Sequence, residues 1–221
     1  MKNPFIHEAH RVEHFQDQSV VDRYHLRPTY SPETFTILNE LIVDEPRVSS
    51  GGVVSLDAAA VTPGITKVGV YEPALIVDDS RQPVPADYTE HLTTLAAEGK
   101  RDEAVEYFLT QAVGIPAEYI GGMKQDQATW SGMTGVAHSI AYDAAFVSNV
   151  MQGKPLPTYR WVKVTLPVLV ADGGASDAWV HHATDALAKV LPHASRQTLE
   201  GQTHMVDPKV LAPVIIEFFK K

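Results

Sequence analysis

Alternation of helix-like and strand-like segments constrains the fold of this chain more than any other feature. Residues 166–171 (LPVLVA) form a continuous apolar run, which is typical of a strand buried on both faces of a parallel sheet. Further strand-like and helix-like segments lie around it, the strands at residues 67–72 (KVGVYE) and 196–199 and the helices at 52–60, 177–191 and 207–221. This order predicts an α/β fold, a mostly parallel sheet flanked by helices.

A helical block interrupts this alternation between residues 86 and 151, which contain no strand signal. Trp130, Met133 and Ala137 begin an apolar face that continues with helical spacing to Met151. We therefore expect a helical insertion between the strands at residues 67–72 and 166–171. Before residue 47 the pattern is different, because residues 31–43 have helix-like spacing and no clear apolar strand is present.

Composition excludes several classes of function. The 221 residues carry a formal net charge of -9, and the basic residues are scattered, which argues against a nucleic-acid partner. The chain has no Cys, hence no disulfide and no thiolate metal site. No apolar run approaches the roughly 20 residues that span a membrane. The first 22 residues lack the apolar core of a secretory signal, so the expected location is cytoplasmic.

Two short segments far apart in the sequence carry the chemistry. Ser49 and Ser50 are followed by Gly51, Gly52 and a helix of small residues, and His204 follows the last predicted strand. A serine hydroxyl is a poor nucleophile near neutral pH unless a base removes its proton. A serine on a tight turn together with a late histidine on a loop would meet that need.

These segments resemble the α/β-hydrolase fold family, in which a nucleophile elbow, an acid and a histidine follow one another along the chain. The resemblance covers about residues 47–221, with residues 86–151 placed like the family's lid. It implies that Ser49 is the nucleophile, that the Ser50 backbone N–H is an oxyanion donor and that His204 is the base. Residues 1–46 form an atypical N-terminal segment.

Several carboxylates compete for the role of the acid that orients His204. Alignment of residues 172–177 (DGGASD) with the family's usual turn puts Ser176 at the acid position. Asp177, one residue later, is the first choice, Asp172 the second, and Asp143 on the insertion the third. Asp177 could instead simply cap the helix that follows it.

The sequence departs from the family pattern at the front. Arg47 replaces the first Gly of the elbow and Pro46 precedes it, so the strand that leads to Ser49 is short or disrupted. No segment of residues 1–46 matches the loop that supplies the second oxyanion donor. The early strands are reduced or missing, and the open edge of the sheet favours a homodimer or a covering N-terminal segment.

The sequence is compatible with three candidate functions. The first is hydrolysis of a small, fairly apolar ester or amide by Ser49 and His204, with Trp130 and Met133 lining the substrate pocket or packing in the core. It needs no cofactor, because the nucleophile and the base belong to the chain. The second is a degenerate binding or assembly protein without turnover. The third uses metal at His7, His10 and His14, which share one potential helical face, although a solvated face explains them better.

Overall fold

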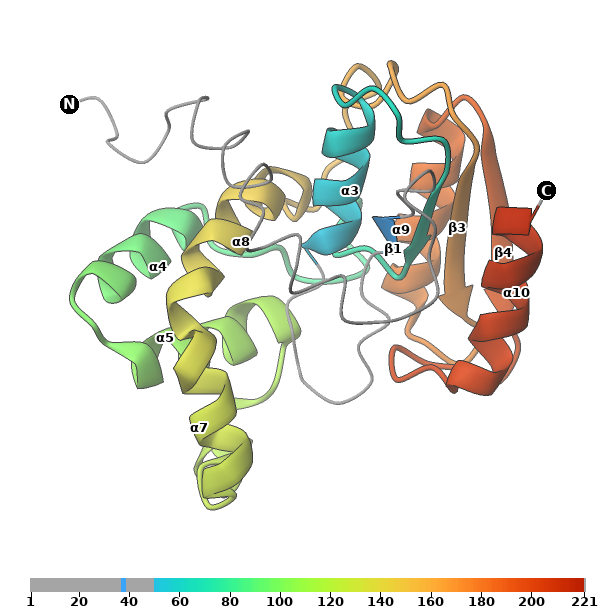
Figure 1. The fold of residues 1–221 in the computed structure, drawn as a ribbon. Helices are drawn as coiled ribbons and strands as arrows, with labels where there is room; N and C mark the ends of the chain where they lie inside the picture. Colours follow the sequence, from blue (N-terminus) through green and yellow to red (C-terminus); the bar gives the residue numbers. More distant parts are fainter. Residues whose placement is uncertain (1–36, 39–49, 221) are drawn as a thin grey trace. The chain divides into compact units, whose positions relative to one another are not determined.

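A sheet of four parallel strands forms the centre of the fold (Figure 1). The computed structural model describes residues 37–38 and 50–220. The strands lie side by side in sequence order, β1 (Ile37–Leu38), β2 (Val68–Tyr71), β3 (Val168–Gly173) and β4 (Ala194–Leu199). All three pairings are parallel. The predicted α/β fold is therefore confirmed, and all six residues of β3 are buried, as the apolar run predicts.

The two residues of β1 differ from the sequence-based expectation. Residues 31–43 have helix-like spacing, yet Ile37 and Leu38 pair with Val68 and Gly69 of β2. Local sequence preference is a weak guide for a segment of this length. Pairing with the edge of β2 decides its conformation. The small sheet agrees with the expectation of reduced front strands.

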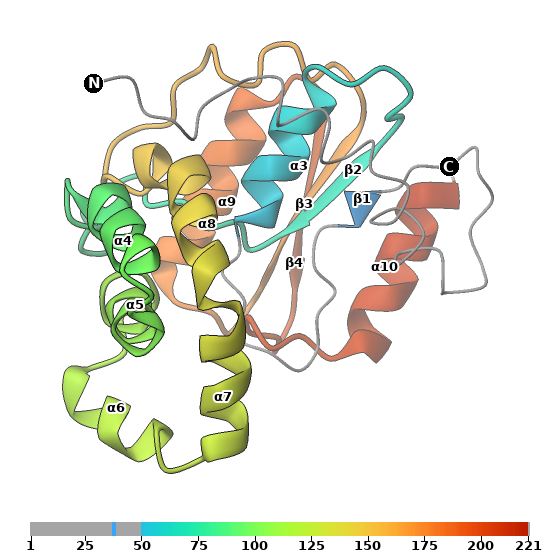
Figure 2. The ribbon, with the colours of Figure 1, turned by 60° about the vertical axis from the view of Figure 1, so that its left-hand side comes forward.

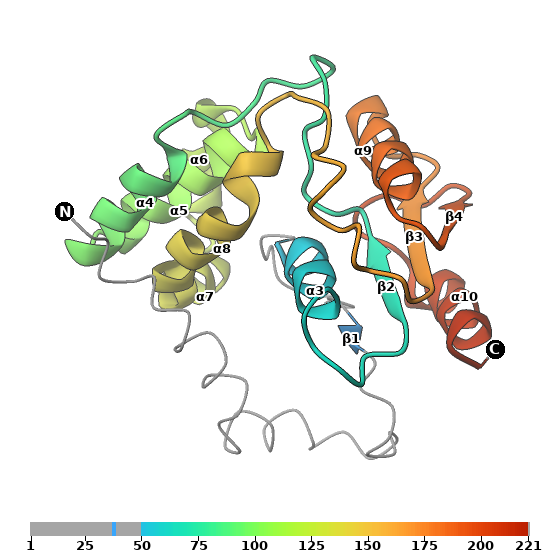
Figure 3. The same ribbon diagram turned by 90° about the horizontal axis from the view of Figure 1, so that it is seen from above.

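Three helices cover the two faces of the sheet. Figure 3 shows α3 (Gly51–Ala59) and α9 (Ala178–Val190) on one face and α10 (Pro208–Lys220) on the other. Val53 and Leu56 of α3 are fully buried beneath the insertion and beside β2. The helix α10 begins at the predicted N-cap, where Asp207 Oδ1 accepts a hydrogen bond from Lys209 N at 2.8 Å. These contacts fix the helices whose neighbouring loops form the candidate site.

All the described helices between β2 and β3 form the insertion (Figure 2). They are α4 (Tyr88–Ala97), α5 (Arg101–Phe108), the π-helix η1 (Leu109–Val113), α6 (Ala117–Met123), α7 (Gln127–Val136), the 3-10 helix η2 (Ala137–Ser139), α8 (Ile140–Val147) and the 3-10 helix η3 (Ser148–Val150). Figures 1 and 3 both show this group on the side of α3 away from the sheet. Among the described residues, no helix is long and apolar enough to cross a membrane.

Two tethers hold the insertion helix α8 to α3. Ser50, directly before α3, donates a hydrogen bond from its Oγ to Asp143 Oδ1 of α8 at 2.5 Å. Near the other end of α3, Arg160 binds both carboxylate oxygens of Asp57 at 3.1 and 2.8 Å. The same guanidinium donates to the carbonyl oxygen of Phe146 in α8 at 3.1 Å. The position of α8 beside α3 is therefore fixed at two separate points.

Candidate active site

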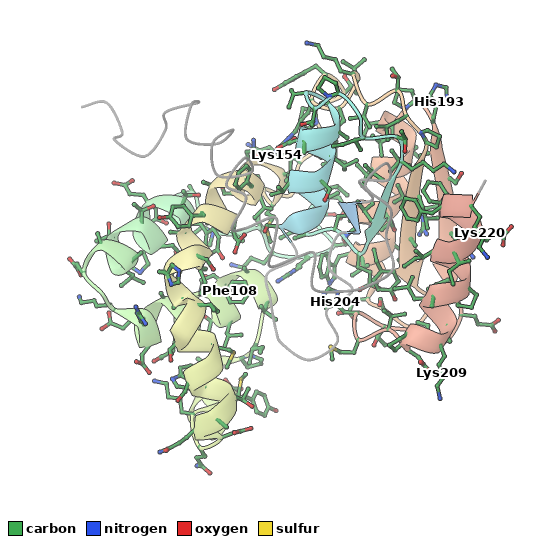
Figure 4. All side chains as sticks on the ribbon, viewed as in Figure 1. Phe108, Lys154, His193, His204, Lys209 and Lys220 are labelled. Atoms are coloured by element: carbon green, nitrogen blue, oxygen red, sulfur yellow. The ribbon has the colours of Figure 1, made fainter. Side chains whose placement is uncertain are left out.

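The candidate site lies at the edge where the strands end. Because β2, β3 and β4 are parallel, their carboxyl ends meet at one edge of the sheet. Glu72 follows β2 directly, Gly173 ends β3, and His204 lies on the loop between β4 and α10. Figure 4 labels His204 at this edge, near the lower end of α3 in that view. The topology thus brings together residues from the ends of β2 and β3 and from the loop after β4.

Glu72 is the carboxylate that contacts His204. The distance from Glu72 Oε2 to His204 Nδ1 is 3.1 Å. The other carboxylate oxygen, Oε1, accepts hydrogen bonds from Gly173 N at 2.8 Å and from Ser176 Oγ at 2.6 Å. Glu72 is only 4% exposed, whereas the His204 side chain is 59% exposed. The arrangement holds a buried carboxylate behind a histidine ring that faces solvent.

The backbone of Glu72 is in an unusual conformation. Its φ of 44° makes it the one described residue other than glycine in the left-handed region. Residues with a Cβ seldom adopt this backbone conformation, and those that do are concentrated at functional sites. The backbone at Glu72 leaves the sheet as a sharp turn, which accompanies the contact of its carboxylate with the loop of His204.

Tyr71 fixes the loop that carries the histidine. Its hydroxyl donates to the carbonyl oxygen of Thr203, next to His204, at 2.7 Å. Burial raises the pKa of Tyr71, and the negative charges of Glu72 and Asp172 raise it further. The hydroxyl therefore keeps its proton throughout the physiological range and remains a donor to this loop.

Gly173 permits the close approach of the same loop. A Cβ on Gly173 would lie 2.3 Å from the carbonyl oxygen of Gln202 and 2.7 Å from the nitrogen of Thr203. Both obstacles are backbone atoms, so rotation of a side chain cannot relieve the clash. The loop is also held by a hydrogen bond from Ala175 N to Gln202 O at 2.8 Å. Only glycine at this position lets the histidine loop lie against the end of β3.

We expect Gly173→Ala to displace this loop. The substitution should cost about 1–3 kcal/mol of unfolding free energy and lower kcat/KM by about 10², since small misplacements of catalytic groups have effects of that size. Thermal unfolding and ester hydrolysis measure the two effects. Gly121→Ala is the matched control, because nothing lies within 4 Å of a Cβ there. Unchanged kcat/KM in Gly173→Ala would show that the tight contact does not set the position of His204.

The expected acids have other partners. Asp172 is fully buried and accepts hydrogen bonds from Arg196 Nη1 at 2.8 Å and Thr184 Oγ1 at 3.0 Å. Asp177 stands directly before α9, where its charge acts on Arg81: burial lowers the pKa of that guanidinium and Asp177 partly offsets the effect. This differs from the sequence-based expectation, in which Asp177 or Asp172 orients the base.

Ser176 gives the physical reason for that difference. It occupies the family's usual acid position but has only a hydroxyl, which donates to Glu72 Oε1. The carboxylate beside His204 therefore comes from Glu72 at the end of β2, whereas the family's usual acid position is at Ser176, after β3. One signal in the sequence marks Glu72: it is a carboxylate that directly follows β2, the strand after α3. The contact of Glu72 with His204 joins distant segments of the chain, so the position of Glu72 in the sequence does not reveal it.

The serine end of the site is described only in part. Ser49 lies outside the described residues, and so do His7, His10 and His14. Ser50 is 4% exposed, and burial raises the pKa of its partner Asp143, an effect that the hydrogen bond from Ser50 opposes. Asp143, the third acid candidate, therefore contacts the residue after Ser49. In the part of the chain that the structure describes, no group of three or more His, Asp or Glu side chains could hold a metal ion.

Trp130 and Met133 lie within the core of the insertion. Trp130 is 7% exposed, and its Nε1 donates to Asp102 Oδ1 of α5 at 2.7 Å. Lys124 Nζ lies 5.2 Å from the centre of the ring. Met133 is buried in the same apolar core cluster. These contacts are those of helix packing within the insertion, and a role of Trp130 and Met133 in a substrate pocket stays a prediction.

Comparison with known proteins identifies the fold family. An α/β hydrolase from Sphaerobacter thermophilus DSM 20745 is 46% identical, with a TM-score of 0.66 over 77% of this chain and 64% of that protein. More distant are an enol-lactonase from Burkholderia xenovorans LB400 (16% identity, TM-score 0.48, 79% and 64% covered) and a thermophilic esterase from Thermogutta terrifontis (15%, 0.49, 77% and 61%). No family model matches the sequence, and no curated protein matches it.

The parallel sheet, the order of its elements and the 46% identity together define the class: the chain belongs to the α/β-hydrolase fold family. It spans 64% of the length of the Sphaerobacter hydrolase, which is less than two thirds of that protein.

Proposed function

We propose that the protein is a serine hydrolase that cleaves small acyl compounds of the ester or amide type. The observation that carries the proposal is the contact of 3.1 Å between buried Glu72 and the exposed ring of His204. A histidine whose Nδ1 faces a fixed carboxylate has its Nε2 available for proton transfer. The fold of the family supports the placement of Ser49 opposite that ring, since Ser50 precedes α3 and the strands end at the same edge.

The proposed mechanism uses Ser49, Ser50 and His204. Ser49 Oγ attacks the acyl carbon while His204 Nε2 takes the hydroxyl proton, and the carbonyl oxygen becomes an oxyanion. The Ser50 backbone N–H donates to that oxyanion. Collapse breaks the bond to the leaving group, which receives the proton from His204. Water then attacks the acyl-enzyme with His204 again as base, and the acid product leaves with Ser49 restored.

Glu72 acts through His204 as a positioning residue. By accepting a hydrogen bond from Nδ1–H of His204, its carboxylate fixes the tautomer of the ring and stabilises the imidazolium that forms during attack. The hydrogen bonds from Gly173 N and Ser176 Oγ hold Oε1, so that Oε2 keeps its direction toward the ring. Preorganisation of this kind avoids reorganisation of the site during the reaction.

A binding protein without turnover is the second candidate. Arg47 stands where the family's elbow has its first Gly, and the elbow is a crowded turn in which small residues let the chain pass. Such a protein would bind small acyl ligands at the same edge, and these ligands would raise its melting temperature without being consumed.

Covalent labelling distinguishes the two candidates. We expect an uncharged fluorophosphonate to modify Ser49, as peptide mass spectrometry would show, because phosphonylation requires an activated hydroxyl. Ser49→Ala should remain unlabelled, whereas Ser50→Ala should still be labelled, since only the backbone of Ser50 has a part in the reaction. No modification of Ser49 in the folded protein would overturn the hydrolase proposal, and thermal stabilisation by acyl ligands would then support the second candidate.

A further inference from the structure

Asp143 is a carboxylate whose charge the packing of the protein does not explain. One oxygen, Oδ1, accepts the hydrogen bond from Ser50 Oγ at 2.5 Å. Among the described residues, no Lys, Arg or His forms an ion pair with it, and no second hydrogen bond reaches its other oxygen. The side chain is half-buried on α8. Removing a carboxylate from water without a cation is costly.

Attachment of α8 to α3 does not require this charge. A neutral amide at residue 143 could accept the same hydrogen bond from Ser50 without the cost of desolvating an anion. The second tether already joins the two helices, because Arg160 binds Asp57 of α3 together with Phe146 O and Asn149 Oδ1. A charged group in this place therefore has a use other than holding the helices together.

Asp143 also lies close to the proposed reaction centre. Ser49, the proposed nucleophile, directly precedes Ser50 in the sequence, and the Asp143 carboxylate contacts the side chain of Ser50. An acyl group bonded to Ser49 would therefore be close to Asp143 in the proposed site. A fixed anion at this distance attracts a cation and repels an anion, most strongly where water is partly excluded.

We propose that Asp143 is a specificity-determining residue that selects acyl substrates carrying a positively charged group near the scissile carbonyl. The inference rests on the proposed function and adds a substrate class to it. The carboxylate supplies the counter-charge for an ammonium group, while Ser50 keeps Oδ1 in place. A substrate with a carboxylate at the same position is disfavoured twice, by repulsion from Asp143 and by the loss of its own hydration.

The same labelling reaction tests this selectivity. Three fluorophosphonates of equal length, ending in a trimethylammonium, an uncharged tert-butyl and a carboxylate group, are compared by their second-order rates of modification of Ser49. We expect the cationic probe to react roughly 10- to 100-fold faster than its uncharged isostere, and the anionic probe to be the slowest. Asp143→Asn should bring the cationic and uncharged probes within about threefold of each other.

Glu118→Gln serves as the matched control, since it removes the charge of an exposed carboxylate on another helix of the insertion and should keep the preference for the cationic probe. Equal rates for the three probes on the wild-type protein would overturn the inference whether or not Asp143→Asn folds. An undiminished cationic preference in folded Asp143→Asn would overturn it as well. These failures differ from failure of the proposed function, in which the uncharged probe does not modify Ser49.

Discussion

Replacing Glu72 with Gln is expected to lower kcat/KM for ester hydrolysis by about 10³–10⁴. The amide can still accept the hydrogen bonds from Gly173 N and Ser176 Oγ through its oxygen. Its NH₂ group then faces His204 Nδ1, which favours the tautomer with the proton on Nε2. That ring cannot take the proton of Ser49, and no carboxylate stabilises the imidazolium.

Transfer of the acid to Ser176 distinguishes this positioning role from a merely structural one. Glu72→Ala should be nearly inactive, and the added Ser176→Asp substitution should restore at least tenfold of the lost kcat/KM, because it puts a carboxylate at the family's usual acid position. The control is Glu200→Gln, which changes an exposed carboxylate at the start of the loop that carries His204 and for which no change is expected. Full activity of Glu72→Gln would remove Glu72 from the mechanism.

Asp172→Asn is expected to destabilise the protein by about 3–5 kcal/mol, the usual cost of leaving a buried ion pair with one charged partner. Asp172 is fully buried in β3, where Arg196 binds both of its carboxylate oxygens and His181 Nδ1 lies 2.7 Å from Oδ2. Denaturant unfolding measures the change. Asp185→Asn is the matched control, because Asp185 contacts the same guanidinium but is 54% exposed, and its loss should cost under about 1 kcal/mol.

The pH dependence of stability tests the same group. Burial alone would raise the pKa of Asp172, but hydrogen bonds from Arg196, His181 and Thr198 lower it to about 2. Because the folded pKa lies below the unfolded value of about 3.9, the contribution of Asp172 is complete above that unfolded value and is lost as the pH falls toward 2. The difference in unfolding free energy between wild type and Asp172→Asn should shrink over this interval. A constant difference would contradict this assignment.

Much of the fold could be predicted because its signals are local. The apolar run at residues 166–171 reflects burial of β3 on both faces, and the helices α9 and α10 follow periodicity and the N-cap at Asp207. The strand β1 could not be predicted, since its two residues owe their conformation to pairing with β2. The local sequence does not determine the conformation of such a short edge strand.

The candidate site could be predicted less completely, because its geometry depends on contacts between distant segments. His204 follows from its place after the last strand. The carboxylate beside it does not, since Asp177 and Asp172 are nearer the family's acid position in sequence and only the path of the turn at Glu72 brings its side chain to the ring. The hydrogen bond between Ser50 and Asp143 likewise joins α3 to a helix far along the chain.

The double attachment of α8 to α3 has a consequence for how a ligand would be received. Ser50 is bonded to Asp143 at one point and Arg160 bridges Asp57 and Phe146 at another, so we expect α8 to keep its position beside Ser50 when a ligand binds. The surface that α8 presents would then be the same before and after binding. Binding against α8 would then cost little entropy for ordering this helix. Any movement that admits a ligand would involve the helices of the insertion that lack these hydrogen bonds.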